Sequence, residues 1–177
     1  DRVWLGEDYW ANPMEDWAIE DGRIVCLRGG ANRNIHLLTY GLREKEGAFT
    51  ASVRLGIQKD SPKNGSAGFS IGIMDDETRD PRASLLYGKG LVAGVKANGK
   101  LFIGKKLADK ALPSLEDVTL RLEVTPNKRK GFHSLRILAF EAATEKELDR
   151  LSWQVAKSET LAGNFAIGCN MDSPTVK

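Results

Sequence analysis

The stretch VTLRLEV (residues 118–124) decides the fold. Its even-numbered positions are apolar and its odd-numbered positions are polar, Arg121 among them. Successive side chains of a β-strand point to opposite faces, so this pattern predicts a strand with one face buried and the other in water. The stretch AFTASVRL (residues 48–55) shows the same alternation, with Arg54 among its outward residues.

Asx-Gly pairs mark the turns between strands. Asp21-Gly22 joins the two short runs of DWAIEDGRIVCLR (residues 16–28), and Asn98-Gly99 does the same within LVAGVKANGKLFIG. Both pairs supply the positive φ values of a type I′ hairpin turn. Ten or more short strands with such turns predict an all-β fold, an antiparallel jelly-roll sandwich with little helix. The remaining strands are expected at residues 34–40, 66–74, 83–87, 130–141 and 161–169.

One segment carries two signals. TEKELDRLSWQVAK (residues 144–157) opens with Thr144 and Glu147 at the spacing of a helix capping box. From Leu151 onward, however, apolar and polar residues alternate. We therefore expect a short turn near residues 144–148 followed by a strand, with a helix as the alternative. A long exposed loop is expected at QKDSPKNGS (residues 58–66), since Pro, Asn, Gly and charge disfavour a ladder.

Length and charge narrow the class of protein. The 177 residues fit one β-sandwich domain, because domains usually hold ~100–200 residues. The chain starts at Asp1 and stops directly after a strand-like segment, so we expect it to come from a longer protein or to lack its last strand. The net charge is +2 and Lys and Arg are spread out, which argues against a nucleic-acid partner. No apolar run approaches ~20 residues, so no membrane span is expected.

Enzyme motifs are weak. Residues 94–100 match G-x-x-x-x-G-K, but Leu101 follows where a phosphate-binding loop needs Ser or Thr. The two histidines, His36 and His133, have no zinc-site spacing, and nothing supports a Ser-His-Asp triad. No strand carries the Glu-x-Asp-x-x-Glu motif of sandwich glucanases, whose paired carboxylates perform retaining hydrolysis.

Three features leave alternatives open. MDDETRD (residues 74–80) is a candidate calcium site or a solvated acidic turn, with Asp75, Asp76 and Asp80 as the metal ligands. Cys26 and Cys169 would meet as a disulfide if the terminal strands pair, and otherwise are two buried free thiols. The early aromatics either stack on sugar rings or fill the core. They are Trp4, Tyr9, Trp10 and Trp17.

The pattern DW-x-I-x-DG-x-I (residues 16–24) resembles the opening of concanavalin A-like jelly rolls, including 3-keto-disaccharide hydrolase domains. A longer set of segments resembles the β-sandwich on the N-terminal side of exported alkaline phosphatase D-like metallophosphatases. These segments are YWANPMEDWAIEDGRIVC, NIHLLTYGL, GSAGFSIGI, LLYGKGLVAGVKANGKLFIG and LAGNFAIGCNMD.

This resemblance implies an accessory domain of an exported, extracytoplasmic protein, with a companion enzyme domain downstream. It carries over no catalytic residue and no cofactor, because the His- and Asp-rich ligand motifs of the phosphatase domain are missing from this chain. The alternative is a glycoside-hydrolase-like domain of the 3-keto-disaccharide hydrolase type, which needs an acidic, polar cleft.

Jelly rolls of this class often hold glycans on a sheet face, so we expect a shallow polar site for a sugar. Tyr87 would serve as the stacking ring. The alternative is that the same face packs on the companion enzyme domain. The candidate ligand-binding residues are His36, Arg54, Tyr87, Lys89 and Arg121.

Overall fold

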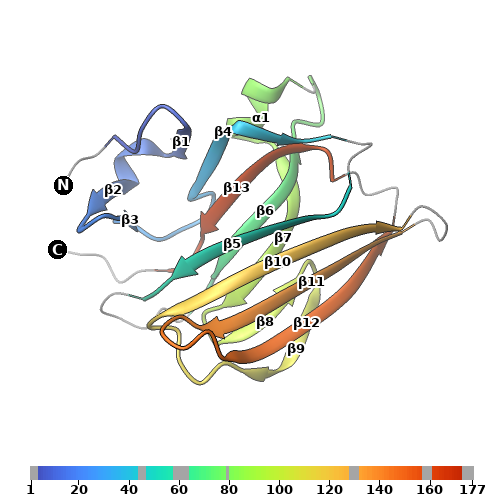
Figure 1. The fold of residues 1–177 in the computed structure, drawn as a ribbon. Helices are drawn as coiled ribbons and strands as arrows, with labels where there is room; N and C mark the ends of the chain where they lie inside the picture. The colour runs from blue at the N-terminus through green and yellow to red at the C-terminus, as the bar shows by residue number, and fades with distance from the viewer. Residues whose placement is uncertain are drawn as a thin grey trace.

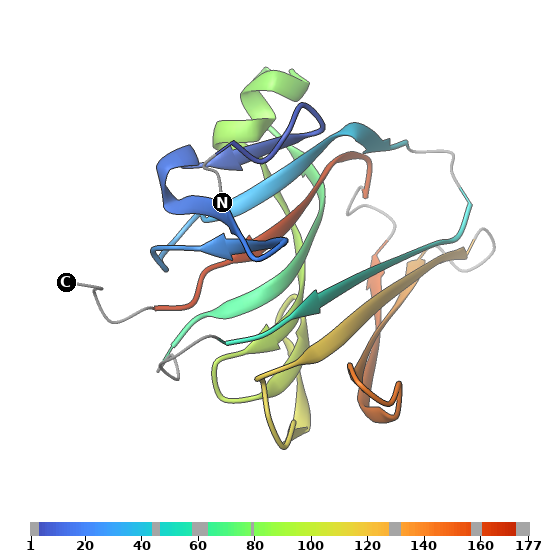
Figure 2. The same ribbon diagram turned by 60° about the vertical axis from the view of Figure 1, so that its left-hand side comes forward.

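Two antiparallel sheets face each other in the computed structural model (Figures 1 and 2). The structure describes residues 4–43, 47–57, 64–78, 80–127, 132–156 and 161–172. The larger sheet has the order β1 (Tyr9–Asn12), β4 (Asn34–Leu42), β13 (Gly163–Cys169), β6 (Ser66–Met74), β7 (Lys89–Lys96), β8 (Lys100–Ile103) and β9 (Lys106–Ala111). The smaller has the order β12 (Glu147–Ala156), β11 (Phe132–Glu141), β10 (Val118–Asn127) and β5 (Phe49–Leu55).

Three small elements complete the fold. A separate hairpin is formed by β2 (Trp17–Glu20) and β3 (Arg23–Cys26), directly after the single-turn helix η1 (Met14–Asp16). The hairpin lies at the end of the larger sheet that is remote from β12 (Figures 1 and 2). The helix α1 (Pro81–Tyr87) connects β6 to β7. The predicted antiparallel β-sandwich with little helix is therefore confirmed.

The core lies between the two sheets and follows the predicted alternation. In β10 the four even-numbered residues of 118–124 are at most 2% exposed, whereas Arg121 is in solvent. They share one apolar cluster with fully buried residues of β6, β7, β8 and β11. The largest of these partners are Phe69, Ile71, Val95, Leu101, Ile103, Leu135 and Ile137.

Both predicted hairpins are present, with different turns. Asp21 and Gly22 have φ of 49° and 73°, as a type I′ turn requires. At the second turn, between β7 and β8, only Gly99 is left-handed, with φ of 81°. The G-x-x-x-x-G-K match at residues 94–100 thus lies in a β-hairpin and not between a strand and a helix.

The expected strand at residues 83–87 is wrong, because this segment is the helix α1. Asp80 caps it by accepting a hydrogen bond from the backbone nitrogen of Arg82 at 2.7 Å, and Pro81 occupies the first turn. Proline with a preceding Asp cap is a helix-start signal that outweighs a short apolar run.

In segment 144–157, the described residues form the expected turn and strand and not the alternative helix. Residues 142–144 form a turn, and β12 follows with Leu151 and Val155 buried. Of the expected loop at residues 58–66, residues 58–63 lie outside the described part of the chain, and Ser66 already begins β6. Among the described residues, no helix is long and apolar enough to span a membrane.

Glycines permit a close approach in the middle of the larger sheet. Gly168, Gly68 and Gly94 lie opposite one another on β13, β6 and β7. A Cβ atom on Gly94 would overlap the carbonyl oxygen of Ala67 and come within 2.8 Å of the Gly68 Cα. Both contacts are with backbone, so a side chain here would force β6 and β7 apart.

We predict that Gly94→Ala lowers the free energy of unfolding by about 2 kcal/mol or more, as overpacking in a closed site does. Gly47→Ala is the matched control, since nothing lies within 4 Å of its added Cβ. It should change stability by less than about 0.5 kcal/mol. Urea denaturation measures both, and equal stability of the two variants would contradict the close approach.

Candidate functional site

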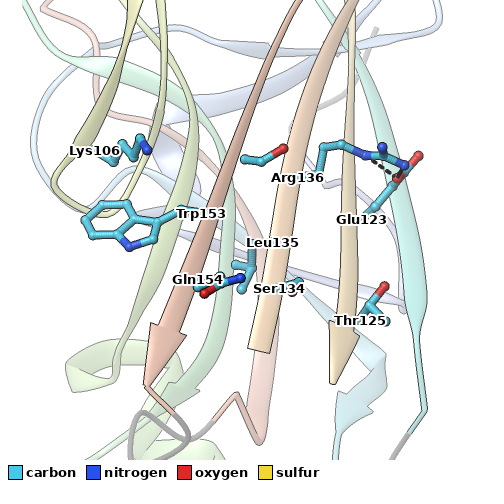
Figure 3. A pocket seen from close by; sticks show the side chains of 9 residues that line it. Lys106, Glu123, Thr125, Ser134, Leu135, Arg136, Trp153 and Gln154 are labelled. Carbon is cyan, nitrogen blue, oxygen red and sulfur yellow. Dashed lines mark hydrogen bonds and ion pairs between the residues drawn. The ribbon is translucent and has the colours of Figure 1, made fainter. Parts of the chain in front are cut away.

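A polar groove of about 700 Å³ lies on the smaller sheet at its β12 edge, lined by outward residues and by the inward residues Leu135 and Trp153 (Figure 3). It crosses β10, β11 and β12 and extends past the edge strand β12 to β9. Its lining residues are Lys106, Glu123, Thr125, Ser134, Leu135, Arg136, Ser152, Trp153 and Gln154.

Strand register places the polar side chains in two rows. Arg136 of β11 lies opposite Glu123 on β10 and opposite Ser152 on β12. One step along, Ser134 lies between Thr125 on β10 and Gln154 on β12 in the same way. Neighbours two residues apart share a strand face, so the residues of both rows point outward while the alternate residues fill the core.

Two of the three charged residues that line the groove, Glu123 and Arg136, neutralise each other, and Lys106 adds a positive charge at the edge. The Arg136 guanidinium donates two hydrogen bonds to Oε2 of Glu123, from Nε at 2.9 Å and from Nη2 at 2.5 Å (Figure 3). Around this pair stand three hydroxyl groups and one amide, which both donate and accept hydrogen bonds. These hydroxyl and amide groups suit a neutral, polar ligand.

The arginines outside the groove on this face are partnered as well. Arg54 binds both carboxylate oxygens of Asp117, at 2.7 and 2.6 Å, and holds the pKa of Asp117 below its ordinary value by these hydrogen bonds. Arg121 lies 4.7 Å from the centre of the Phe140 ring. Further along β12, an ion pair links Arg150 to Glu147. Carboxylates therefore neutralise three of the four arginines on this face, and Arg121 keeps its positive charge beside the ring.

An aromatic ring borders the groove at its edge. Trp153 and Lys106 lie together on the far side of β12 from Arg136 and Glu123 (Figure 3). Trp153 is half-buried and packs against the core, so its ring is held in place while part of it remains accessible.

The five candidate ligand residues do not form one site. Arg54 and Arg121 lie on the outer face of the smaller sheet, beside the groove but not in its lining. His36 is on β4 and Lys89 on β7 of the larger sheet, and Tyr87 ends α1 next to Lys89. The expected grouping fails because it placed residues 83–87 in a neighbouring strand. The order of strands in the sheets cannot be obtained from alternation alone.

His36 is buried and unpartnered. The residue is 1% exposed, and within the described part of the chain neither imidazole nitrogen has a hydrogen-bond partner. Burial lowers the pKa of His36 to about 4, because desolvation disfavours the imidazolium. This burial keeps His36 from direct ligand contact at the surface.

The candidate calcium ligands are used by the fold instead. Asp75 accepts hydrogen bonds from the backbone nitrogen and hydroxyl of Thr78, at 2.8 and 2.6 Å, and these lower the Asp75 pKa. Asp80 caps α1, while the side chain of Asp76 is 80% exposed. Among the described residues, which omit residue 79, no three His, Cys, Asp or Glu side chains are placed to hold a metal ion.

Only one of the four early aromatics fills the core. Trp17 is buried at 4% exposure in a small cluster with Leu5, Ala11 and Ile35. Trp4, Tyr9 and Trp10 remain exposed. Sequence reasoning missed the groove itself, although the alternation of Leu135 and Ile137 with Ser134 and Arg136 in β11 carries the signal.

Comparison with known proteins does not assign the chain to a family. No protein-family model matches the chain, and no curated protein gives a significant sequence match. The fold and site define an antiparallel β-sandwich with a polar groove on its smaller sheet. The side chains that line the groove are the basis for inferring what it binds.

The lowered pKa of the buried His36 predicts that the fold loses stability in acid. Its folded pKa of about 4 lies below the ordinary 6.5, so only the unfolded chain takes up the proton between these values. The contribution of neutral His36 to the free energy of unfolding is fully present above pH 6.5. It decreases by about 1.4 kcal/mol per pH unit toward pH 4. Denaturant unfolding across this range should show that decline, and His36→Gln should flatten it. His133→Gln, the control, should keep it; an unchanged profile in His36→Gln would refute the assignment.

Proposed function

We propose that this chain is a non-catalytic β-sandwich domain that binds a glycan weakly in the groove of β10, β11 and β12. The observation that carries the proposal is the groove's composition: hydroxyls, an amide, one internally neutralised ion pair, and Lys106 and one aromatic ring at its edge. A sugar offers many hydroxyl groups and apolar C–H faces. The polar rows would bind the hydroxyls, and the exposed part of Trp153 would pack on a sugar face.

Weak binding is expected from the shape of the site. Most of the lining side chains are at least partly solvent-exposed, so little of a ligand would be enclosed. A dissociation constant near ~1 mM corresponds to about 4 kcal/mol, which a few hydrogen bonds and one ring contact can supply.

The number of carboxylates that line the groove favours binding over hydrolysis. Retaining glycosidases need two carboxyl groups about 5–5.5 Å apart. Among the described residues that line the groove, Glu123 is the single carboxylate, and Arg136 occupies it with two hydrogen bonds. A 3-keto-disaccharide hydrolase activity is the competing function.

The resemblance to the sandwich of exported phosphatase D-like proteins supports a wider setting for this domain. In that setting the chain is an extracytoplasmic accessory domain that holds glycan near a companion enzyme domain. An export signal and a downstream metallophosphatase sequence in the full-length gene would support it, and the absence of both would count against it.

Oligosaccharide titration of the 177-residue chain tests the site. Gln154→Ala and Ser134→Ala should each weaken binding about fivefold, because each removes about 1 kcal/mol of hydrogen bonding. Thr39→Ala, at an exposed position of β4, is the matched control and should have no effect. Tyr87→Ala should also have no effect, since Tyr87 is 72% exposed on α1, outside the groove.

Two results would reject the proposal. No binding at millimolar sugar, or loss of binding in Tyr87→Ala alone, would remove the groove as the glycan site. Turnover of a 3-keto-disaccharide that is abolished by Glu123→Gln would instead establish the hydrolase.

A further inference from the structure

The chain's two cysteines meet at one place in the fold. Cys26 ends β3 and Cys169 ends β13, at opposite ends of the sequence. Both are half-buried free thiols that pack against the same apolar cluster, that of Leu5, Ala11, Trp17 and Ile35. Their shared packing places the two thiols close enough for each to shift the pKa of the other. The Cys26 thiol also donates a hydrogen bond to the carbonyl oxygen of Arg28 at 3.3 Å.

Independent contacts hold both cysteines in position. On one side, the backbone nitrogen of Cys169 donates to the carbonyl oxygen of Arg33 at 2.8 Å. On the other, the buried carboxylate of Asp16, at the start of the hairpin, binds the Arg33 guanidinium at 2.7 Å. Leu27, next to Cys26, donates its backbone nitrogen to the Asp16 carbonyl at 2.7 Å. Arg33 therefore connects both partners, and their meeting follows from the fold.

We propose that Cys26 and Cys169 are a reversible disulfide site that fastens the β2–β3 hairpin to β13 when the chain meets an oxidising thiol pool. Among the described residues the hairpin forms no ladder with either main sheet, and the small apolar cluster and the Asp16–Arg33 ion pair attach it. A covalent bond at this point would add a third attachment.

The two thiols differ in readiness to react. Interaction with the Cys26 thiol lowers the pKa of Cys169, against the opposing effect of burial. Interaction with Cys169, burial and the nearby Asp16 carboxylate raise the pKa of Cys26, so Cys169 is the thiol that more readily loses its proton. The thiolate is the nucleophile in disulfide exchange, which makes Cys169 the attacking residue.

Glutathione disulfide supplies the oxidant in the reaction we propose. The Cys169 thiolate attacks one of its sulfur atoms, the sulfur–sulfur bond breaks, and a glutathione thiolate leaves. Cys26 then loses its proton and attacks the Cys169 sulfur of the mixed disulfide, releasing the second glutathione. Two protein thiols are oxidised, one glutathione disulfide is reduced to two glutathiones, and the released thiolates take up the two protons.

The test is to equilibrate the 177-residue chain in a series of glutathione to glutathione disulfide ratios and map its peptides without reduction. We expect a Cys26–Cys169 cross-linked peptide in monomeric protein, reversed by dithiothreitol. Because the cross-link closes a long loop, the melting temperature should rise by on the order of 10 °C. Cys26→Ser and Cys169→Ser should each abolish both the cross-linked peptide and the rise.

Three results would overturn the proposal. The first is a single glutathione adduct that never resolves into the cross-link, and the second is cross-linking only between chains. The third is an intramolecular cross-link that leaves the melting temperature unchanged, which would remove its fastening role. The peptide map of the unsubstituted chain tests for the cross-link even if a serine variant fails to fold.

Discussion

The structure depends on the burial of one face of each sheet against the other. Leu120 and Leu122 at the middle of β10 are 0% exposed and share one apolar cluster with Ile71 and Val95 of the larger sheet. Full burial of such a side chain contributes about 1.5–3 kcal/mol, and a register slip by one residue would exchange every buried side chain for a polar one. Packing of the inner faces therefore also decides which residues point outward. The groove residues of β10, β11 and β12 are the outward half of that alternation.

Different interactions stabilise the two ends of the molecule. Over β10 to β12, several outward charges are neutralised in pairs such as Arg136 with Glu123. At the far end, the hairpin adds a second, smaller apolar cluster and the buried Asp16–Arg33 pair. A carboxylate this buried needs its cation, because an unpaired charge in such a place is costly. The cysteines sit on this second cluster, away from the groove.

Local patterns predicted local structure well. The alternation of residues 118–124, the Asp21-Gly22 turn and the strand at residues 66–74 could be seen without a structure, because each depends on neighbours in sequence. The helix at residues 81–87 was missed because its start signal, Asp80-Pro81, is short and the following apolar run fits a strand equally well. The groove was missed for another reason: it needs the pairing of β10, β11 and β12, which alternation does not specify. For the same reason His36 could not be recognised as buried and unpartnered.

The central claim is that the outward face of the smaller sheet is the ligand-binding face. Amide chemical-shift mapping by NMR during titration with an oligosaccharide tests it most directly, since it reports on both sheets at once. The account predicts shifts that gather on β10, β11 and β12 around Ser134, Arg136 and Gln154. Shifts that gather instead on the larger sheet and α1, around Trp10 and Tyr87, would contradict it.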